Sequence, residues 1–263
     1  MINVCNMLKK FYWFMSTQFG IDLIKTFRAF SGFPRYVRDL FRFCRSYRGR
    51  LGLLPCLHDW IEESGATKNE YFWQDLLVAR KIFEVNPVKH VDIGSRVDGF
   101  VAHVASFRKV EVFDIRPITA QIPGIVFKQL DFTKPIEGMT GYCDSVSCLH
   151  ALEHFGLGRY GDSVNPKGFE LGFKNMARLL KENGIFYLSV PVGAERVEFN
   201  AHRVSDPRVI IGLAMRNSLE LSSLILIHQE GKIETFSLEK AKLLNLTSQR
   251  YVLGIFIFVK LER

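Results

Sequence analysis

Residues 91–99 read Val91-Asp92-Ile93-Gly94-Ser95-Arg96-Val97-Asp98-Gly99. An apolar run ends here in Asp-x-Gly and continues through small residues into a helical pattern. This order is typical of the first strand of an α/β sheet, where glycine lets the backbone approach a nucleotide-like ligand. We therefore expect the sheet, and any ligand site, to extend outward from this turn.

Short apolar runs alternate with helical patterns after residue 70. The expected strands span residues 90–93, 110–113, 125–127, 145–148, 185–190, 224–227 and 254–260, and the expected helices span 71–84, 99–106, 171–181 and 237–244. Parallel neighbours need crossover connections, so this alternation predicts a mostly parallel sheet. The predicted fold class is α/β, with helices on both faces of the sheet.

The composition is typical of a folded protein in a reducing cellular compartment. The chain has 263 residues, of which 48% are hydrophobic, enough for one substantial core. Its five cysteines form no Cys-x-x-Cys pair, so neither a disulfide framework nor a zinc knuckle is indicated, and a cytoplasmic location is expected.

The net charge of +8 belongs to residues 1–50, which hold ten Lys and Arg against two acidic residues. This segment is rich in aromatic residues, and residues 36–47 have the pattern of a basic amphipathic helix. Its longest apolar run, 11–15, is far shorter than the ~20 residues of a membrane-spanning helix, and no secretory signal is indicated. We expect a helical extension over residues 1–60 and a main domain over residues 61–263.

Two interpretations of the extension remain open. Its basic helix can attach peripherally to an anionic membrane surface, at the inner face of the membrane. Alternatively, it packs on the main domain and leaves a solvated basic face. Nucleic acid is not an expected partner, because no recognised binding module accompanies the basic residues. The sequence leaves the oligomeric state open.

Acidic side chains follow three successive predicted strands. Asp92 lies at the first strand end with Gly94, and Asp114 follows the second, twenty residues after Gly94. Asp131 follows the third strand, beside the apolar Phe132. Strand ends meet at one edge of such a sheet. There, Asp92 could hold an ammonium, Asp114 could accept from ribose hydroxyls and Asp131 could accept from an adenine amino group.

With these residues, the chain from about residue 88 onward resembles the class I S-adenosylmethionine-dependent methyltransferases. The resemblance implies a Rossmann-like seven-stranded sheet with an antiparallel strand in its final pair, and S-adenosylmethionine as cofactor. It assigns Gly94 to the methionine part, Asp114 to the ribose and Asp131 to the adenine. The implied cofactor-binding residues are Asp92, Gly94, Ser95, Arg96, Asp114, Asp131 and Phe132.

One feature departs from that family. The usual Gly-x-Gly-x-Gly turn is replaced by residues 94–99, where Arg96 and Asp98 add bulk. A nicotinamide dinucleotide is the rival ligand, because a second-strand acid would hold its ribose equally well. The Gly-x-Gly-x-x-Gly turn that admits a pyrophosphate is missing, which favours S-adenosylmethionine.

Proton-handling residues follow the fourth predicted strand. Methyl transfer is an in-line displacement in which the protein aligns a nucleophile and often removes its proton. Histidine suits that removal, since its ordinary pKa is ~6.5. His154 is the first candidate base and His150 the second, with Glu153 orienting either ring or binding a substrate hydroxyl. Alternatively, His150 caps the strand and His154 satisfies a buried backbone group. No third ligand accompanies the two histidines, so no metal is predicted.

A second polar cluster, residues 195–203, follows the fifth predicted strand and is expected to face the same pocket. His202 joins the candidate catalytic residues. The polar side chains suit a polyhydroxylated or anionic substrate, and a solvated loop is the alternative. The predicted substrate-binding residues are Arg159, Tyr160, Asp162, Asn200 and Arg203.

Four motifs together resemble a narrower group, domain-of-unknown-function family 268, over about residues 65–205. They are Tyr71-Phe72-x-Gln74-Asp75, residues 91–99, residues 156–162 and Phe199-Asn200-Ala201-His202-Arg203. That family is often associated with bacterial surface-polysaccharide genes. The family name supplies no established reaction. With the three strand-end carboxylates and the histidine-rich loop after the fourth strand, we expect O-methylation of a sugar, on a glycan or sugar nucleotide. The alternative is a non-catalytic methyltransferase-fold partner of a glycan-assembly or membrane complex, which binds through residues 1–50.

Overall fold

The computed structural model of the protein describes residues 4–65, 67–228, 231–236 and 240–262. The chain forms two compact units, Met1–Ala66 (unit 1) and Thr67–Arg263 (unit 2). The expected boundary lay six residues earlier, after residue 60. Unit 1 contains helices α1 (Val4–Gln18) and α2 (Leu23–Cys44) and the short η1 (Asp59–Ile61).

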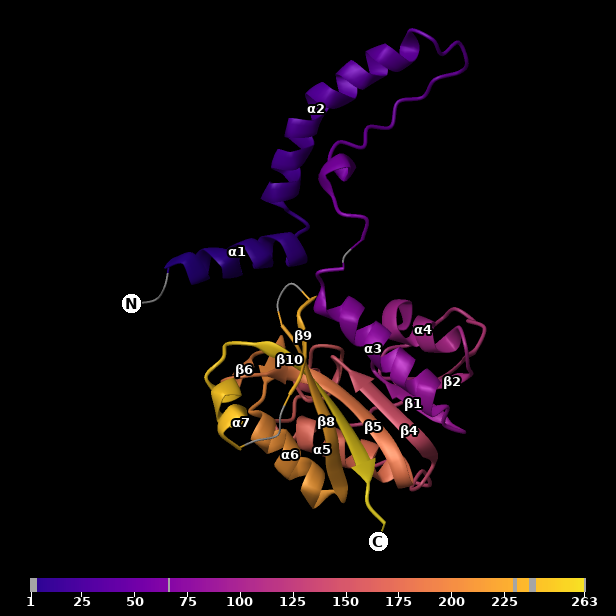
Figure 1. The fold of residues 1–263 in the computed structure, drawn as a ribbon, viewed down its shortest axis with the longest axis vertical. Helices are drawn as coiled ribbons and strands as arrows, with labels where there is room; N and C mark the ends of the chain where they lie inside the picture. The colour runs from indigo at the N-terminus through magenta and orange to yellow at the C-terminus, as the bar shows by residue number, and fades with distance from the viewer. Residues whose placement is uncertain (1–3, 66, 229–230, 237–239, 263) are drawn as a thin grey trace. The chain divides into compact units, whose positions relative to one another are not determined.

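Unit 2 is built on one large sheet (Figure 1). Its described strands run in the order β3-β2-β1-β4-β5-β10-β8-β9. Their bounds are β1 (His90–Ile93), β2 (Val110–Asp114), β3 (Ile125–Gln129), β4 (Cys143–Leu149), β5 (Leu180–Val192), β8 (Leu219–Ile227), β9 (Ile233–Thr235) and β10 (Val252–Lys260). Strands β1, β2, β3, β4 and β5 are parallel to one another, while β10 is antiparallel to both β5 and β8. All seven predicted strands are present, and the short β9 adds an eighth at the edge.

Helices cover both faces of this sheet, as predicted. One face packs on α3 (Glu70–Val85), the π-turn η2 (Val97–Val101) and α4 (Ala102–Ala105). The other packs on α5 (Gly168–Leu179), α6 (Pro207–Arg216) and α7 (Lys240–Thr247). Successive side chains of a strand point to opposite faces, so strands β5, β8 and β10 contribute alternate residues to two separate apolar cores. Residues 237–239 of the predicted helix 237–244 lie outside the described residues, and α6 was not predicted.

Helix α3 brings its first turn to the carboxyl edge of the sheet. Asn69 caps it by accepting a hydrogen bond from the Tyr71 amide (2.9 Å). The helix ends at Asn86, which adopts the left-handed conformation just before Pro87. Both caps come from the local sequence, and together they fix where α3 begins and ends.

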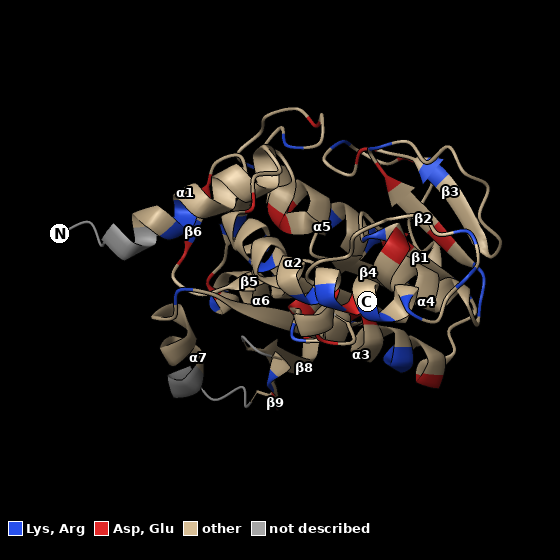
Figure 2. Cartoon of the chain, turned by 90° about the horizontal axis from the view of Figure 1, so that it is seen from above, with Lys and Arg blue, Asp and Glu red and all other residues tan. Residues whose placement is uncertain are grey.

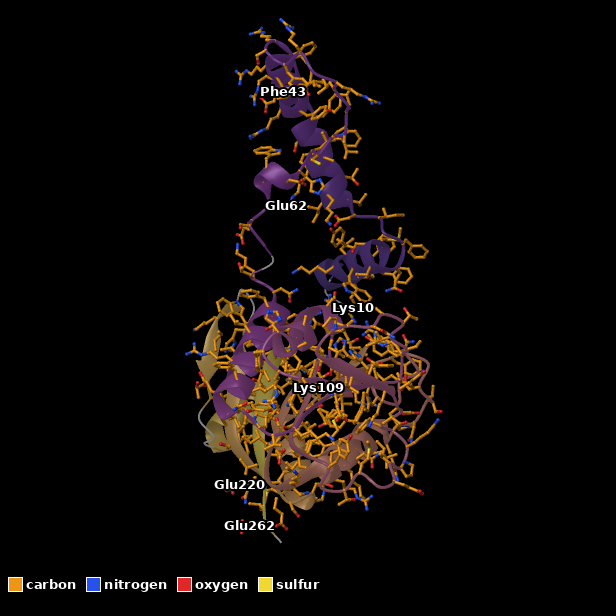
Figure 3. All side chains as sticks on the ribbon, turned by 90° about the vertical axis from the view of Figure 1, so that its right-hand side faces the viewer. Lys10, Phe43, Glu62, Lys109, Glu220 and Glu262 are labelled. Carbon is orange, nitrogen blue, oxygen red and sulfur yellow. The ribbon has the colours of Figure 1, made fainter. Side chains whose placement is uncertain are left out.

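Unit 1 has little core of its own. Asp22 caps α2 by accepting from the amides of Ile24 (3.0 Å) and Lys25 (2.9 Å), and it also accepts from the Tyr12 hydroxyl of α1 (2.6 Å). Among the described residues of α2 only Gly32 is buried. The predicted helix 36–47 is the C-terminal part of α2. Figure 3 shows the side chains of this unit, with Phe43 labelled near the end of the helix.

Candidate functional site

The turn after β1 is held by Asp92. Its carboxylate is fully buried and accepts hydrogen bonds from the Ser95 amide (3.1 Å), the Ser95 hydroxyl (2.6 Å) and the Ser147 hydroxyl of β4 (2.6 Å). Burial raises the pKa of Asp92 to about 7, although these hydrogen bonds oppose the shift. Ser95 in turn accepts from the Leu149 amide (3.0 Å). Asp92 and Ser95 thus tie the turn to β4.

Two glycines of this turn are sterically required. Gly94 has φ +72°, and a Cβ there would lie 3.0 Å from the Ala151 Cβ. A Cβ on Gly99 would lie 2.6 Å from Oδ2 of Asp75, a buried α3 carboxylate. The bulky side chains of Arg96 and Asp98 do not fill the turn, because they form a bidentate ion pair with each other on its exposed side.

Asp114 ends β2 with its side chain 9% exposed. Its carboxylate is engaged by Arg116, whose backbone amide (2.8 Å) and Nε (3.1 Å) donate to Oδ1 and whose Nη2 donates to Oδ2 (2.8 Å). The Arg116 guanidinium also lies over the Tyr160 ring, 4.4 Å from its centroid. The predicted ribose acid is therefore at the strand edge, but a side chain of the same chain occupies it.

At the third strand end, Asp131 is engaged by residues of the following turn. Asp131 accepts from the amide (2.9 Å) and hydroxyl (2.6 Å) of Thr133 and forms an ion pair with Lys134. Burial opposes the effect, but the Thr133 hydrogen bonds and Lys134 hold the pKa of Asp131 below its ordinary value. Phe132 is buried and stacks on Phe113 in the core, with ring centroids 5.8 Å apart. Its ring belongs to the packing behind this strand end.

A buried network of charges lies at the end of β4. His150 Nδ1 is 2.7 Å from Glu153 Oε1, and His150 Nε2 is 3.4 Å from Glu70 Oε1 of α3. The Tyr251 hydroxyl donates to Glu70 (2.5 Å), and the Tyr71 ring packs on His150 at 4.5 Å. The second Glu153 oxygen, Oε2, is buried without a hydrogen-bond partner among the described residues. Three segments far apart in sequence thus converge on one histidine.

His150 is an imidazolium at neutral pH. Burial alone would lower the pKa of His150, but Glu153 and Glu70 outweigh it and raise the pKa to about 9. A ring that already carries its proton at pH 7 cannot remove one from a substrate. Residue 150 also has φ +52°, an uncommon conformation outside glycine that points the ring into the network. His150 therefore has the geometry of a group that holds Glu153 in place.

His154 has the opposite character. Its Nδ1 is 2.6 Å from the Ala201 carbonyl oxygen, which can only accept, so Nδ1 carries the hydrogen and Nε2 is the basic nitrogen. Burial is the main cause that lowers the pKa of His154, and Arg159 adds to it. The ring is thus neutral at pH 7, with Nε2 3.7 Å from Glu153 Oε1. His154 has the protonation state that a general base requires.

The two predicted polar clusters meet. Strands β6 (Arg196–Glu198) and β7 (His202–Val204) form a hairpin. From it, Arg203 donates to the carbonyls of Phe155 (2.6 Å) and Glu153 (3.3 Å), while Arg159 donates to Ala201 O (2.8 Å). These contacts seat the hairpin on the loop after β4.

The remaining predicted substrate residues differ in exposure. Asp162 accepts from the amides of Gly156 (2.6 Å) and Tyr160 (3.3 Å), so it shapes the loop. Tyr160 packs edge-on to the His154 ring at 5.3 Å. His202 is partly buried, which lowers its pKa, and Asn200 is exposed.

The sequence did not single out three residues of this site. Glu70 precedes the Tyr71-Phe72-x-Gln74-Asp75 motif, but nothing local marks it as a partner of His150. Tyr251 is separated from Glu70 by 181 positions, and Arg116 resembles any surface arginine. Each gains its role from a tertiary contact. In contrast, the α3 motif itself is explained: Gln74 accepts from Ser189 of β5, and Asp75 abuts Gly99.

Solved structures establish the fold of unit 2. A 1,6-didemethyltoxoflavin-N1-methyltransferase from Burkholderia thailandensis, with bound 1,6-didemethyltoxoflavin and S-adenosylhomocysteine, has a TM-score of 0.52 and 13% identity, covering 77% of this chain and 81% of that chain. The [4+2]-cyclase SpnF has a TM-score of 0.52 and 11% identity, covering 72% and 82%. At such identities the likeness shows the fold alone, a methyltransferase-like Rossmann fold.

Sequence comparison gives the family. No curated protein matches this sequence. The family model described as "Caenorhabditis protein of unknown function, DUF268" matches residues 120–253, whereas the motifs quoted above span about residues 65–205. The match covers more than half of the 263 residues, and the chain therefore belongs to the DUF268 family.

Proposed function

We propose that the protein is an S-adenosylmethionine-dependent methyltransferase. The observation that carries the proposal is the juxtaposition, at one edge of a methyltransferase-like sheet, of a glycine turn with positive φ, a strand-end carboxylate and a neutral histidine whose Nε2 carries no hydrogen. These groups are Gly94, Asp114 and His154. Ligands of open α/β sheets bind at this edge.

The residues fit an adenosyl cofactor unevenly. Gly94 presents the turn with no side chain, as close approach of a ligand requires. Asp114 is suitably placed for ribose hydroxyls once Arg116 moves aside. Asp131 offers a carboxylate beyond the third strand, with Phe132 behind it. Asp92 supports the turn from inside rather than reaching a ligand. When bound, the cofactor supplies an electrophilic methyl group.

The chain's own contribution is proton removal and charge stabilisation. In the proposed reaction His154 Nε2 takes the proton of the acceptor hydroxyl as that oxygen becomes nucleophilic. The resulting imidazolium is stabilised by Glu153, 3.7 Å away. Protonated His150 in turn holds Glu153 through a 2.7 Å hydrogen bond. His150 and Glu70 are thus positioning residues, and His154 is the candidate catalytic base.

The proposed acceptor is a sugar hydroxyl, on a glycan or sugar nucleotide of surface-polysaccharide synthesis in the cytoplasm. Support comes from the polar groups beside His154: Arg159 and Tyr160 on the β4 loop and exposed Asn200 on the hairpin. Hydrogen-bonding and cationic groups of this kind suit hydroxyl-rich or anionic substrates.

Calorimetric titration with S-adenosylhomocysteine tests the cofactor assignment. We expect saturable binding to the wild-type protein and a loss of about tenfold or more in affinity for Asp114→Asn, because a charge-assisted acceptor is removed. Asp206→Asn is the matched control, since Asp206 has the same arrangement with an arginine two residues on and only caps α6. Absence of binding up to millimolar ligand would overturn the proposal.

We also propose that unit 1 contacts an anionic membrane surface. An α-helix has about 3.6 residues per turn, so one stripe of α2 contains Leu23, Phe27, Phe30 and Phe41, which are 67–76% exposed. Arginines 28, 35, 38 and 42 follow along one side of this stripe. Gly32 is on a third face, which packs on Leu57 and Trp60. Figure 2 marks the basic residues of α1 and α2 in blue.

Charge and residue type favour a lipid surface. Helix α2 carries five basic residues and one acidic residue, and phenylalanine beside arginine suits the boundary between acyl chains and anionic headgroups. None of the described helices combines the length and apolar character needed to cross a bilayer. The proposed mode is therefore a helix lying along the surface.

Vesicle sedimentation with the full chain tests this second proposal. We expect binding to phosphatidylcholine vesicles only when phosphatidylglycerol is included, weakened by salt and abolished by combined Phe27→Ser and Phe30→Ser. Met215→Ser, a 71% exposed residue of α6, should bind normally. Equal binding to neutral vesicles, or none to anionic ones, would refute it. Dimerisation of the wild type that the paired serine variant abolishes would instead assign the stripe to a second copy.

The alternative function is a non-catalytic partner of a glycan-assembly or membrane complex. The exposed apolar surface of unit 1 favours it, because such a surface can bind a protein partner. It predicts that in cells the paired Phe27→Ser and Phe30→Ser variant loses function while Asp114→Asn does not. A methyltransferase requires Asp114→Asn to lose function.

A further inference from the structure

The most informative contact outside the proposed chemistry is the pairing of Arg116 with Asp114. Both oxygens of the carboxylate are engaged, Oδ1 by Arg116 N and Nε and Oδ2 by Nη2. A carboxylate has about four lone-pair sites, so three of them are taken by one residue. The side chain of Asp114 is 9% exposed, and that of Arg116 is 48% exposed.

The pair also connects two parts of the site. The Arg116 guanidinium lies 4.4 Å from the centroid of the Tyr160 ring, which also packs edge-on to the ring of His154 at 5.3 Å. A second guanidinium, that of Arg159, lies 5.1 Å from the same Tyr160 centroid. Contact therefore continues from the end of β2 to the loop that carries the candidate base.

We infer that Arg116 competes with the cofactor ribose for the Asp114 carboxylate, so that cofactor binding requires the Arg116 guanidinium to be displaced. This inference rests on the proposed function. Ribose hydroxyls need the same acceptor lone pairs that Arg116 now uses, and a side chain that is half exposed can move into solvent without unfolding its surroundings. Arg116 is thus a residue that sets cofactor affinity by opposing it.

Displacement of Arg116 from Asp114 also affects the loop after β4, because Arg116 packs on Tyr160 of that loop. Displacement of the guanidinium removes one of the two cations that pack on Tyr160. Tyr160 then holds its edge contact with His154 by fewer interactions, so the ring over the candidate base becomes more mobile when the ribose is bound. Binding at β2 is in this way linked to the β4 loop.

A local pairing without competition is the simplest alternative, and the chain contains a matched example. Asp206 accepts from the backbone amide (2.8 Å) and Nε (3.0 Å) of Arg208, and from its Nη2 (2.5 Å), again two residues on. That pair caps α6 and has no contact with Tyr160 among the described residues. Arg208→Ala therefore removes the same kind of interaction away from the cofactor edge.

Calorimetry on the full chain with S-adenosylhomocysteine separates these possibilities. Because ion pairs at a protein surface contribute modestly and the Arg116 partner of this pair is half exposed, we expect Arg116→Ala to bind about two- to fivefold more tightly than wild type. We expect Arg208→Ala to bind like wild type. Salt should strengthen binding to wild type relative to Arg116→Ala, because it screens the competing ion pair.

The possible outcomes are distinct. Unchanged or weaker binding by Arg116→Ala, with wild-type binding intact, overturns the competition and leaves the proposed function standing. An equal gain in affinity for Arg208→Ala also overturns the competition, since the gain would then come from the loss of any positive charge and not from Arg116 itself. If wild type, Arg116→Ala and Arg208→Ala all fail to bind at millimolar ligand, the proposed function fails and this inference fails with it.

Discussion

The two units use the same kinds of residue in opposite ways. In unit 2 large aromatic side chains such as Phe173, Phe186 and Phe258 are fully buried between the sheet and its helices. In unit 1 Phe27 and Phe30 are 76% and 75% exposed, and their helix buries little more than Gly32. The presence of phenylalanine alone does not tell these segments apart. What differs is whether a second layer covers the apolar face.

The difference separates stability from interaction. Apolar burial stabilises a fold roughly in proportion to the area removed from water, so unit 2 has the residues that hold the chain folded. A large exposed apolar stripe with a basic border contributes little to folding and marks a contact surface. Substitutions in unit 2 should therefore change stability more than substitutions in unit 1.

Removing a core ring of unit 2 should have the greatest effect on stability. Phe258 lies 6.1 Å from Phe173 and 6.2 Å from Phe186, measured between ring centroids. We expect Phe258→Ala to lower the free energy of unfolding by about 3–5 kcal/mol and Phe30→Ala by less than about 0.5 kcal/mol, measured by urea denaturation. Similar losses in both variants would remove the distinction between the units.

Breaking the buried network of unit 2 should come next. Glu153→Gln leaves the His150 imidazolium with Glu70 as its remaining carboxylate. We expect a loss of about 3 kcal/mol, since breaking a buried pair leaves an uncompensated charge, seen as a lower melting temperature. Glu84→Gln, which breaks the exposed pair with Arg80, should cost less than about 1 kcal/mol. Equal costs would show that burial of this network has no energetic importance.

The network also predicts how stability depends on pH. The pKa of His150 is raised to about 9 in the folded chain, against an ordinary value of ~6.5. Its contribution is therefore complete below pH ~6.5 and is lost as the pH rises through about 9, up to about 2–3 kcal/mol in total. Denaturation of wild type and His150→Asn at several pH values measures it. The variant should show a shallower decline, and parallel curves would contradict the assignment.

The smallest global effect is expected in unit 1. A Cβ on Gly32 would lie 1.7 Å from the Leu57 carbonyl oxygen, whereas Gly52 has open space around it. We expect Gly32→Ala to expose residues 51–60 to proteolysis while the unfolding of unit 2 shifts by less than about 0.5 kcal/mol. Gly52→Ala should be cleaved like wild type. A large shift in the global transition for Gly32→Ala would show that the two units unfold together.

Local patterns were sufficient to predict the frame of unit 2. Alternation of apolar runs identified the seven main strands, and the Asp92-x-Gly94 turn identified the end of the first strand, at the carboxyl edge of the sheet. Strand ends were less predictable. The helical pattern continued to residue 181, but β5 begins at Leu180 because Leu180 pairs with Cys143 on β4. Helix α6 was missed although Asp206 caps it and Pro207 begins it.

The site was predictable in outline only. Only the structure distinguished the protonated His150 from the neutral His154. The protonation of each ring depends on tertiary partners that no local motif reveals. Glu70 meets His150 across 80 positions of chain, and Tyr251 arrives from the start of β10. Likewise, the sequence placed Asp114 at a strand end but did not show that Arg116 would engage it.

Hydrogen exchange with and without S-adenosylhomocysteine tests most directly whether the carboxyl edge of unit 2 is the ligand site. We expect slower amide exchange at residues 91–99 and 112–116 when the ligand is added, with residues 23–61 unchanged. No change at millimolar ligand, or slowing confined to residues 23–61, would contradict it.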